Sequence, residues 1–559
     1  MQKQKLNINR ELIALILINS LAVIYVFWIN NLLGGKLSVR VYYRLFTDNE
    51  LIIFILNIIT LSISYLVTNY NIYFIYYVKN IIITLSLIKV VKVCLPIIAF
   101  IITFVGTYFV FHNYLLSMDE YAPGFQAAIF LSGKLRAVVA QPWQEFADSL
   151  APIFTIYNPT MHSWYQGYLP VYAVIKTLFL SLAIPSATNP VLAALTVIFI
   201  GLAVTNIWPQ EKNAPFLAML LLMSSSQFLI TSMTGYSWPA HLLLNIIWIY
   251  CYTHKLKYAG LLLPIIGIIA LGVHNPFVHG LFAVPFLLRI LRERPWKFSF
   301  YVCTVYLIGS LFWLGYWKFI TPQPALESSY PTTIFTFPGL VQVIIIQPLN
   351  IFLTLSWQSL SIVLLAFFAL RNWGKLIPLY RDLYWGFALT VGFYFFFNSD
   401  QGHGWGYRYI YGILGNLVLL AMVGWYKLRE AIGVEKAINF LIVTLGFALF
   451  IQFPIRCVQA ELFVRPFASA MQYLQSRPES FILMDATKIW YSQDFVRNDP
   501  FLLDRPKFFF SHKLSNEQRE HLNKLGKVHE VEPDELLRFG LIRMEPTKIK
   551  DDQEKQAAP

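Results

Sequence analysis

Long apolar stretches dominate this chain and alternate with short polar connections. Residues 11–33 and 50–68 each come close to the ~20 apolar residues that a membrane-spanning helix needs. A weaker run at 71–88 contains Lys79, and another run covers 93–116. Later runs predict spans at 190–208, 214–232, 238–253, 258–273, 276–289, 298–320, 348–370, 383–398, 407–426 and 437–456. The pattern predicts a polytopic α-helical membrane protein with about 11–14 transmembrane helices.

Basic residues concentrate in a subset of the loops, which predicts the orientation of the spans. Lysine and arginine are enriched in cytoplasmic loops of membrane proteins. The loops that we therefore place in the cytoplasm contain Arg289, Arg292, Arg294 and Lys297; Arg371, Lys375 and Arg381; Lys427, Arg429 and Lys436; Lys255 and Lys257; and Lys212. The connections at 185–190, 232–237, 274–276, 321–347 and 398–407 are nearly free of basic residues, so we expect them on the extracytoplasmic side.

Composition excludes an ordinary soluble protein. Of the 559 residues, 57% are hydrophobic and 13% are charged, whereas soluble domains are about 25% charged. The net charge of +13 comes largely from the short loops, so we interpret it as topology and expect no nucleic-acid partner. The four cysteines show neither a disulfide framework nor zinc-ligand spacing.

The first long polar stretch, residues 116–166, holds the strongest candidate chemistry. Asp119 and Glu120 follow directly on an apolar run, where a carboxylate is tolerated if it faces water. Such a pair can also simply mark the end of a helix. Residues 124–135 have apolar positions at helical spacing and predict a short helix on the membrane surface. The next run, 168–184, is either a half-inserted helix or a full span.

The chain changes character after the last predicted span. Mixed sequence replaces the apolar runs and predicts a small extracytoplasmic α/β domain at 457–546, followed by a disordered tail at 547–559. We expect residues 1–92 to form additional N-terminal transmembrane helices. Residues 93–456 form the main membrane module.

Four segments of this module resemble one family of membrane enzymes. DEYAPGFQAAIFLSGKL (119–135) and WYQGYLPVYAVI (164–175) resemble the first extracytoplasmic loop of GT-C-fold glycosyltransferases, in the branch of protein O-mannosyltransferases and aminoarabinose transferases. TGYSWPAHLLL (234–244) and GHGWGYRYIYGILG (402–415) are similar to later segments of that family. The chain departs from the family pattern with His274-Asn275-Pro276 in place of an Arg-Pro pair, and with Gly406-Tyr407-Arg408 in place of Gly-Pro-Arg.

The resemblance implies transfer of a sugar from a polyprenyl-phosphate donor to a glycan, lipid or protein acceptor. Asp119 is the expected base, with Glu120 beside it to orient the acceptor or to tune the pKa of Asp119. Arg408 is expected to bind the donor phosphate with the help of His403, although an arginine here can equally extend to lipid headgroups. Direct displacement predicts inversion at the anomeric carbon.

A set of aromatic and histidine side chains is expected to line the substrate groove, and the same residues also suit an interfacial aromatic belt. They are Tyr121, Trp164, Tyr165, Tyr236, His241, His274 and Tyr407. The spacing of His241, His274 and His279 does not indicate a metal site, and we expect no required cofactor. A transporter or flippase for a lipid-linked saccharide is the alternative function. We expect a bacterial inner-membrane protein whose active site faces the periplasm.

Overall fold

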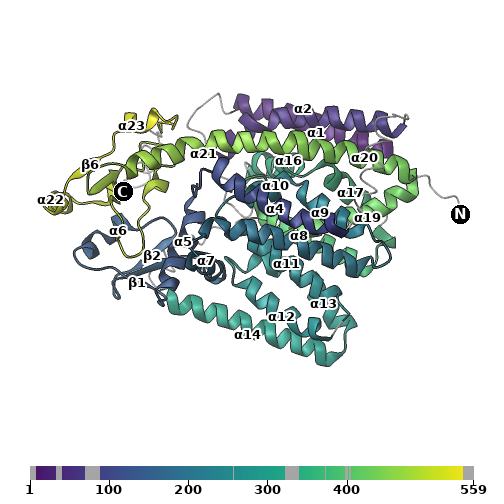
Figure 1. Ribbon diagram of the computed structural model, residues 1–559, viewed down its shortest axis with the longest axis horizontal. Helices are drawn as coiled ribbons and strands as arrows, with labels where there is room; N and C mark the ends of the chain where they lie inside the picture. Colours follow the sequence, from purple (N-terminus) through teal and green to yellow (C-terminus); the bar gives the residue numbers. More distant parts are fainter. Residues whose placement is uncertain are drawn as a thin grey trace, which may run out of the picture.

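The computed structural model describes residues 8–32, 41–69, 89–255, 257–321, 339–340, 342–371, 373–396, 401 and 404–544. The predicted span at 71–88, most of the 321–347 loop, His403 and the predicted tail lie outside these residues. The described chain is a bundle of helices with two small sheets at one end (Figure 1).

The protein is a multi-pass α-helical membrane protein. By length and composition, seven described helices can cross a membrane, or up to eight if one bent pair of helices counts as a single span. They include α1 (Ile8–Leu32), α2 (Val41–Asn69), α4 (Lys89–Phe109), α8 (Thr188–Ile207), α14 (Trp296–Ile320) and α19 (Leu414–Ile432), and the continuous helix formed by α20 (Val434–Phe447), η6 (Ala448–Gln452) and α21 (Phe453–Gln475).

Shorter helices account for part of the difference from the predicted count of 11–14. Several predicted spans are helices of fewer than 18 residues, and the single span predicted at 214–232 is divided into two helices, α9 (Ala214–Met223) and α10 (Ser226–Thr231). The other short helices are α11 (Trp238–Thr253), α12 (Lys257–Leu271) and α13 (Phe277–Glu293). The remaining bundle elements are η2 (Pro185–Ala187), η3 (Gln342–Ile346), α16 (Gln347–Trp357), α17 (Leu360–Leu370), η4 (Trp373–Lys375), α18 (Pro378–Phe395) and η5 (Arg408–Ile413).

The predicted run 93–116 is not one helix. Helix α4 ends at Phe109, and His112 and Asn113 follow with positive φ angles of 54° and 51°, which turns the chain. Helix α5 (Met118–Leu131) then begins six residues earlier than the predicted start at 124. Its start is favoured because Ser117 is extended at the N-cap and acidic side chains in the first turn complement the helix dipole.

The polar stretch at 116–166, predicted to be an outer loop, continues through a small antiparallel sheet to a short helix. The sheet has the order β1-β3-β2 and consists of β1 (Ala137–Val138), β2 (Thr155–Asn158) and β3 (Ser163–Gln166); η1 (Trp143–Phe146) and α6 (Ala147–Leu150) precede β2. Helix α7 (Val171–Ser181) has 11 residues and packs on α5. At 1.5 Å per residue it is about 16 Å long, so it agrees with the half-inserted alternative for residues 168–184.

The C-terminal domain is α/β, as predicted. Its parallel sheet has the order β5-β4-β6, with β4 (Phe481–Met484), β5 (Lys507–Phe510) and β6 (Val528–Glu530). It also contains η7 (Ser492–Phe495), η8 (Ser511–Lys513), α22 (Asn516–Leu525) and α23 (Pro533–Leu537). One buried cluster joins this domain to the first outer loop, because Phe125, Phe146 and Trp164 pack with Phe481 and Phe509.

A single long helix connects the bundle to this domain. Residues Val434–Gln475 are helical over 42 residues, which corresponds to about 63 Å against a hydrocarbon core of about 30 Å. Figure 1 shows α21 running along the molecule to the end where α5, α6, α22 and α23 gather. The predicted domain boundary at 456–457 thus falls inside this helix, and the division into domains stays a prediction.

Candidate functional site

Asp119 is held at the start of α5 by two side chains from distant parts of the chain. Arg408 Nη1 lies 3.0 Å from Asp119 Oδ2, and the hydroxyl of Tyr168 donates a hydrogen bond to Oδ1. The side chains of Asp119 and Arg408 are 18% and 15% exposed. The carboxylate is therefore largely enclosed but keeps some contact with solvent.

The loop before Arg408 is fixed by backbone contacts. Gln401 Oε1 accepts the N–H of Arg408 at 2.7 Å, and Gln227 Nε2 donates to the carbonyl of Tyr407 at 2.8 Å. Gly406 has a φ of +72°, and a Cβ there would lie 2.9 Å from the Trp357 side chain. Glycine is thus required at 406 by the turn and by the close approach to Trp357.

Aromatic rings surround the guanidinium of Arg408. Its central carbon lies 5.5 Å from the ring centroids of both Tyr236 and Tyr409. Tyr394, at the end of α18, stacks on Tyr409 with centroids 4.3 Å apart. Neither Tyr394 nor Tyr409 was among the predicted site residues. Tyr409 directly follows Arg408 in the sequence, whereas nothing in the apolar run of α18 distinguishes Tyr394.

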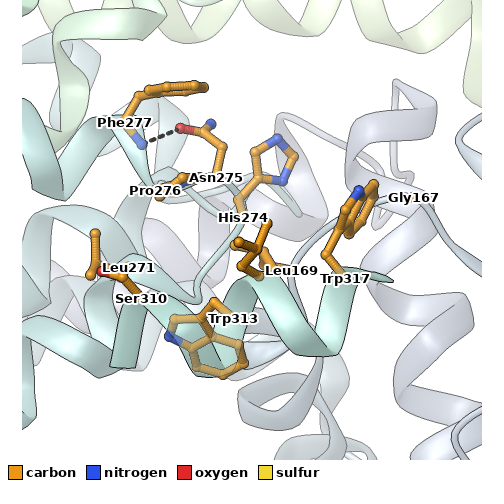
Figure 2. Close-up of a pocket in the computed structure, with 11 residues that line it drawn as sticks. Gly167, Leu169, Leu271, His274, Asn275, Pro276, Phe277, Ser310, Trp313 and Trp317 are labelled. Atoms are coloured by element: carbon orange, nitrogen blue, oxygen red, sulfur yellow. Dashed lines mark hydrogen bonds between the residues drawn. The ribbon is translucent and has the colours of Figure 1, made fainter. Parts of the chain in front are cut away.

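An apolar pocket of about 530 Å³ is lined by His274, and neither Asp119 nor Arg408 belongs to its lining. Figure 2 shows His274 and Asn275 on one side, with Trp313 and Trp317 of α14 on another. The ring of His274 packs on Tyr168 with centroids 3.9 Å apart, and Tyr168 contacts Asp119. The polar site and the apolar pocket are consequently connected through Tyr168 and His274.

Glu120 points away from Asp119, although the two are adjacent in the sequence. Successive residues of an α-helix are about 100° apart around its axis. Glu120 is fully buried; its Oε2 accepts the N–H of Gly235 at 2.7 Å, and its Oε1 accepts the N–H of Ser117 at 3.3 Å. These bonds fasten the start of α5 to the segment that carries Tyr236.

The two carboxylates have opposite pKa shifts. Burial raises the pKa of Glu120 to about 7, against the smaller effects of its bonds to Gly235 and Ser117 and of the nearby charge of Lys176. Burial alone would also raise the pKa of Asp119, but Arg408, His274 and the Tyr168 hydrogen bond outweigh it, so this pKa is lowered. Asp119 is therefore an ionised carboxylate at neutral pH.

The C-terminal domain also reaches the start of α5. Arg497 Nη2 donates to the carbonyl of Leu116 at 3.3 Å, and the guanidinium lies 4.3 Å from the ring centroid of Tyr114. Burial raises the pKa of Asp494 to about 7, and the charges of Asp119 and Glu120 add to the shift. Sequence reasoning missed both residues, because the mixed sequence around them carries no motif.

Three predicted groove residues contact other parts of the protein. The Tyr121 hydroxyl donates to the carbonyl of Asn498 at 3.0 Å, and the Trp164 indole N–H donates to that of Pro500 at 2.8 Å. Tyr165 is buried, and Arg136 lies over its ring at 5.7 Å. Tyr121 and Trp164 therefore attach the outer loop to the C-terminal domain.

The other predicted residues lie in or next to the bundle. His241 is 1% exposed and packs near Trp238, and Tyr407 is buried in the core. In the part of the chain that the structure describes, the two ring nitrogens of His241 and the hydroxyl of Tyr407 have no hydrogen-bond partner. By contrast, His279 contacts Asn245 at 2.7 Å and Tyr306 at 2.8 Å. Among the described residues, no group of three or more His, Cys, Asp or Glu could hold a metal ion.

Comparison with known proteins identifies the architecture. No protein-family model and no curated protein matches the sequence. Among solved structures, the crystal structure of ArnT from Cupriavidus metallidurans bound to undecaprenyl phosphate matches with a TM-score of 0.51 and 12% identity, covering 73% of this chain and 85% of that one. The chain has a GT-C fold.

A second structure, ArnT from Cupriavidus metallidurans in the apo state, matches with a TM-score of 0.48 and 12% identity over 73% of this chain and 84% of that one. The match to the structure with bound undecaprenyl phosphate confirms the GT-C fold predicted from the four sequence segments. At 12% identity this likeness shows the fold alone.

Proposed function

We propose that this protein transfers a sugar from a polyprenyl-phosphate donor to an acceptor hydroxyl of a glycan, lipid or protein. The observation that carries the proposal is the Asp119–Arg408 pair, which Tyr168 and His274 connect to an apolar pocket. Each part of the site suits one part of the reaction. The carboxylate can deprotonate a hydroxyl, the guanidinium can bind a phosphate, and the apolar cavity can hold an isoprenoid chain. The undecaprenyl phosphate in the ArnT structure of the same fold supports this donor class.

In the proposed reaction, Asp119 removes the proton from the acceptor hydroxyl. The acceptor oxygen attacks the anomeric carbon while the bond from that carbon to the phosphate oxygen breaks. The electron pair leaves with the polyprenyl phosphate, whose added negative charge Arg408 stabilises. A single displacement inverts the anomeric configuration. Donor, acceptor and these side chains supply every atom and charge, so no cofactor is required.

The ion pair itself suggests how donor binding would activate the base. Arg408 is the main opposing charge that lowers the pKa of Asp119 and thereby makes it a weaker base. A phosphate bound to Arg408 would neutralise that charge and raise the basicity of Asp119. The base would then be strongest when the donor is present, which limits proton transfer to the productive complex.

Buried polar groups near Arg408 are candidates for sugar contacts. Tyr236 and Tyr409 flank Arg408, and Tyr407 lies 6.0 Å from Tyr409 between ring centroids. Within the described residues, the Tyr407 hydroxyl and both His241 ring nitrogens are unpartnered, and sugar hydroxyls are suitable partners for them. We place the protein in a bacterial inner membrane, with the site at the periplasmic side.

Substitution of Asp119 by Asn tests the proposal. Asparagine keeps the size of the side chain and an oxygen that can accept from Tyr168, but it cannot act as a base. In reconstituted vesicles that contain a polyprenyl-phosphate sugar, we expect sugar transfer to fall by about 10²- to 10⁴-fold. Binding of polyprenyl phosphate should persist, because Arg408 loses its competing partner.

Asp148 provides the matched control. It is an exposed carboxylate on the same outer loop, in α6, and the Asp148→Asn variant should transfer sugar at the rate of the unmodified protein. Full transfer by a folded Asp119→Asn variant would contradict the role of Asp119 as base. Movement of the lipid-linked sugar across the vesicle membrane without transfer would favour a flippase.

A further inference from the structure

A second carboxylate–arginine pair lies buried on the other side of the Arg408 loop. Arg456 Nη2 lies 2.6 Å from Glu50 Oε2, and Arg456 Nη1 lies 2.8 Å from Glu50 Oε1. Their side chains are 0% and 2% exposed. Removal of two charges from water is costly, and ionisable residues inside membrane helices commonly serve function. This pair joins α2 to α21, and the site described above does not include it.

The Glu50–Arg456 pair lies at the break between helices α16 and α17. Helices α16 and α17 are bent by 113° at their junction, which leaves carbonyl groups of α16 without helical partners. Arg456 Nη2 donates to the carbonyl of Ser356 at 3.0 Å, and Gln452 Nε2 donates to the same carbonyl at 2.6 Å. Because Ser356 is fully buried, its carbonyl cannot bond to bulk water, and these donors stabilise the break.

Trp357 contacts both the Glu50–Arg456 pair and the loop that precedes Arg408. Its indole N–H donates to Glu50 Oε1 at 2.9 Å, and the Arg456 guanidinium lies 4.1 Å from the centroid of its ring. The same tryptophan leaves no room for a Cβ at Gly406, and its ring lies 6.2 Å from that of Trp405. The side chain of Trp357 thus lies between Glu50 and the turn at Gly406, two residues before Arg408.

A second connection runs parallel to the first. Gln358, the residue after Trp357, donates from Nε2 to Gln227 Oε1 at 2.7 Å, and Gln227 donates to the carbonyl of Tyr407 at 2.8 Å. The break between α16 and α17 therefore approaches Gly406 directly through Trp357 and reaches Tyr407 through Gln227. A shift of the break would displace the two residues that precede Arg408.

We propose that Glu50 and Arg456 are positioning residues for Arg408. Their ion pair clamps the N-terminal helices α1 and α2 to the α16–α17 break, and the clamp fixes residues 404–408 in the conformation that pairs with Asp119. The effect on the loop follows from the contacts alone. The effect on catalysis rests on the proposed function, in which Arg408 binds the donor phosphate.

The chain contains a matched control for this clamp. Glu11 of α1 pairs with Arg371, directly after the C-terminal end of α17, and its side chain is 7% exposed. This pair also fastens the N-terminal helices to the bundle. It lies at the opposite end of α17 from the break, about 16 Å along the helix. Loss of Glu11 should therefore weaken the attachment of α1 without reaching the Arg408 loop.

Hydrogen exchange and donor kinetics of the full-length protein in nanodiscs test the proposal. For Glu50→Gln, we expect exchange of the amides at 404–408 to accelerate at least about tenfold. We also expect kcat/KM for a polyprenyl-phosphate sugar to fall by about 10- to 100-fold, since small displacements of a catalytic group have effects of this size. Glu11→Gln should change neither quantity by more than about twofold.

The double variant Glu50→Gln/Arg456→Gln separates positioning from folding. It contains no unpaired buried charge, so it should fold even if Glu50→Gln does not, and it should show the same rapid exchange at 404–408. Unchanged exchange in both Glu50 variants, as in Glu11→Gln, would overturn the positioning role regardless of activity. Rapid exchange with normal donor binding and transfer would preserve the clamp but contradict the proposed role of Arg408.

Discussion

Two carboxylate–arginine pairs lie on either side of the loop at 404–408, and they differ in how completely they are enclosed. Asp119 and Arg408 share one direct hydrogen bond of 3.0 Å and are 18% and 15% exposed. Glu50 and Arg456 share two, of 2.8 and 2.6 Å, and are 2% and 0% exposed. The first pair has room for a ligand to replace one partner, whereas the second pair is closed.

This difference in exposure indicates two roles for a carboxylate–arginine pair: one stabilises the structure, and the other can open to bind a ligand. A fully buried pair is costly to open, because loss of one partner leaves an uncompensated charge in an apolar environment. Removal of one partner from a partly exposed pair costs less stability, because water or a ligand can take the place of the missing partner. We therefore expect Glu50–Arg456 to stay intact during turnover and Asp119–Arg408 to open when the donor binds.

The same substitution at both arginines gives the largest expected effects. Arg456→Gln leaves Glu50 buried and unpaired, so we expect the free energy of unfolding to fall by about 3–5 kcal/mol. Arg408→Gln should lower it by about 1–2 kcal/mol. It should also reduce sugar transfer by about 10²- to 10³-fold, because the departing phosphate loses its charged partner. Thermal unfolding and transfer assays on both variants measure these quantities.

The opposite stability ranking of the two variants would contradict the distinction between a structural pair and a ligand-binding pair. If Arg408→Gln unfolds the protein while Arg456→Gln leaves it stable, then the partly exposed pair is the structural one. If transfer is unchanged in a folded Arg408→Gln variant, the phosphate binds elsewhere.

Glu120 is an intermediate case, since it is buried as deeply as Glu50 but is held largely by neutral donors. Its pKa is raised from 4.5 to about 7, so the folded protein retains a proton on Glu120 that the unfolded chain releases. This contribution to stability is fully present below about pH 4.5 and is lost as the pH rises through about 7. A shift of this size corresponds to about 3 kcal/mol.

Comparison with Glu120→Gln measures that contribution. The difference in apparent melting temperature between the unmodified protein and the variant should decrease steadily from pH 5 to pH 8. His274, with a pKa lowered by burial to about 4, titrates in both proteins and cancels from the difference. The charge of Glu120 adds to the raised pKa of Asp494, so both proteins are compared in an Asp494→Asn background. A difference that is constant over this range would show that Glu120 is ionised throughout.

Gly406 lies between the two pairs, and its substitution should affect stability about as little as Arg408→Gln does. An alanine at 406 must adopt a φ of +72° and approach Trp357. We expect a loss of about 1–2 kcal/mol, together with reduced transfer because Arg408 shifts. Gly392→Ala in α18 is the control: a Cβ there meets no atom within 4 Å, and alanine favours the helix. Equal behaviour of the two variants would mean that the turn at 406 tolerates a side chain.

Much of the fold was predictable because membrane spans have a strong local signal. The predicted span at 238–253 matches α11, and the mixed sequence after the bundle does form an α/β domain. The predicted run at 93–116 was wrong at its end because a turn at His112 and Asn113 interrupts apolar sequence. Hydropathy does not report backbone direction, so it could not locate the start of α5.

The candidate site was predictable only in part. Asp119 and Arg408, 289 residues apart, are in contact as the shared orientation of their loops suggested. From the sequence, Asp119 and Glu120 were predicted to act together in one reactive site. In helix α5 their side chains point in different directions and contact different partners. Glu50, Arg456, Tyr394 and Arg497 lie in segments with no motif, and their relevance arises from packing between elements that are distant in the chain. Pairwise contacts of this kind leave no periodic pattern in a single sequence.

A structure of the protein with polyprenyl phosphate would show directly whether Arg408 binds the donor phosphate. We expect phosphate density within hydrogen-bond distance of the Arg408 guanidinium. The isoprenoid chain should enter the pocket beside His274 and Trp313, and the Asp119–Arg408 pair should be open. The Glu50–Arg456 pair should be unchanged in that complex. Phosphate density at another position, with Asp119 and Arg408 still paired, would contradict this role of Arg408.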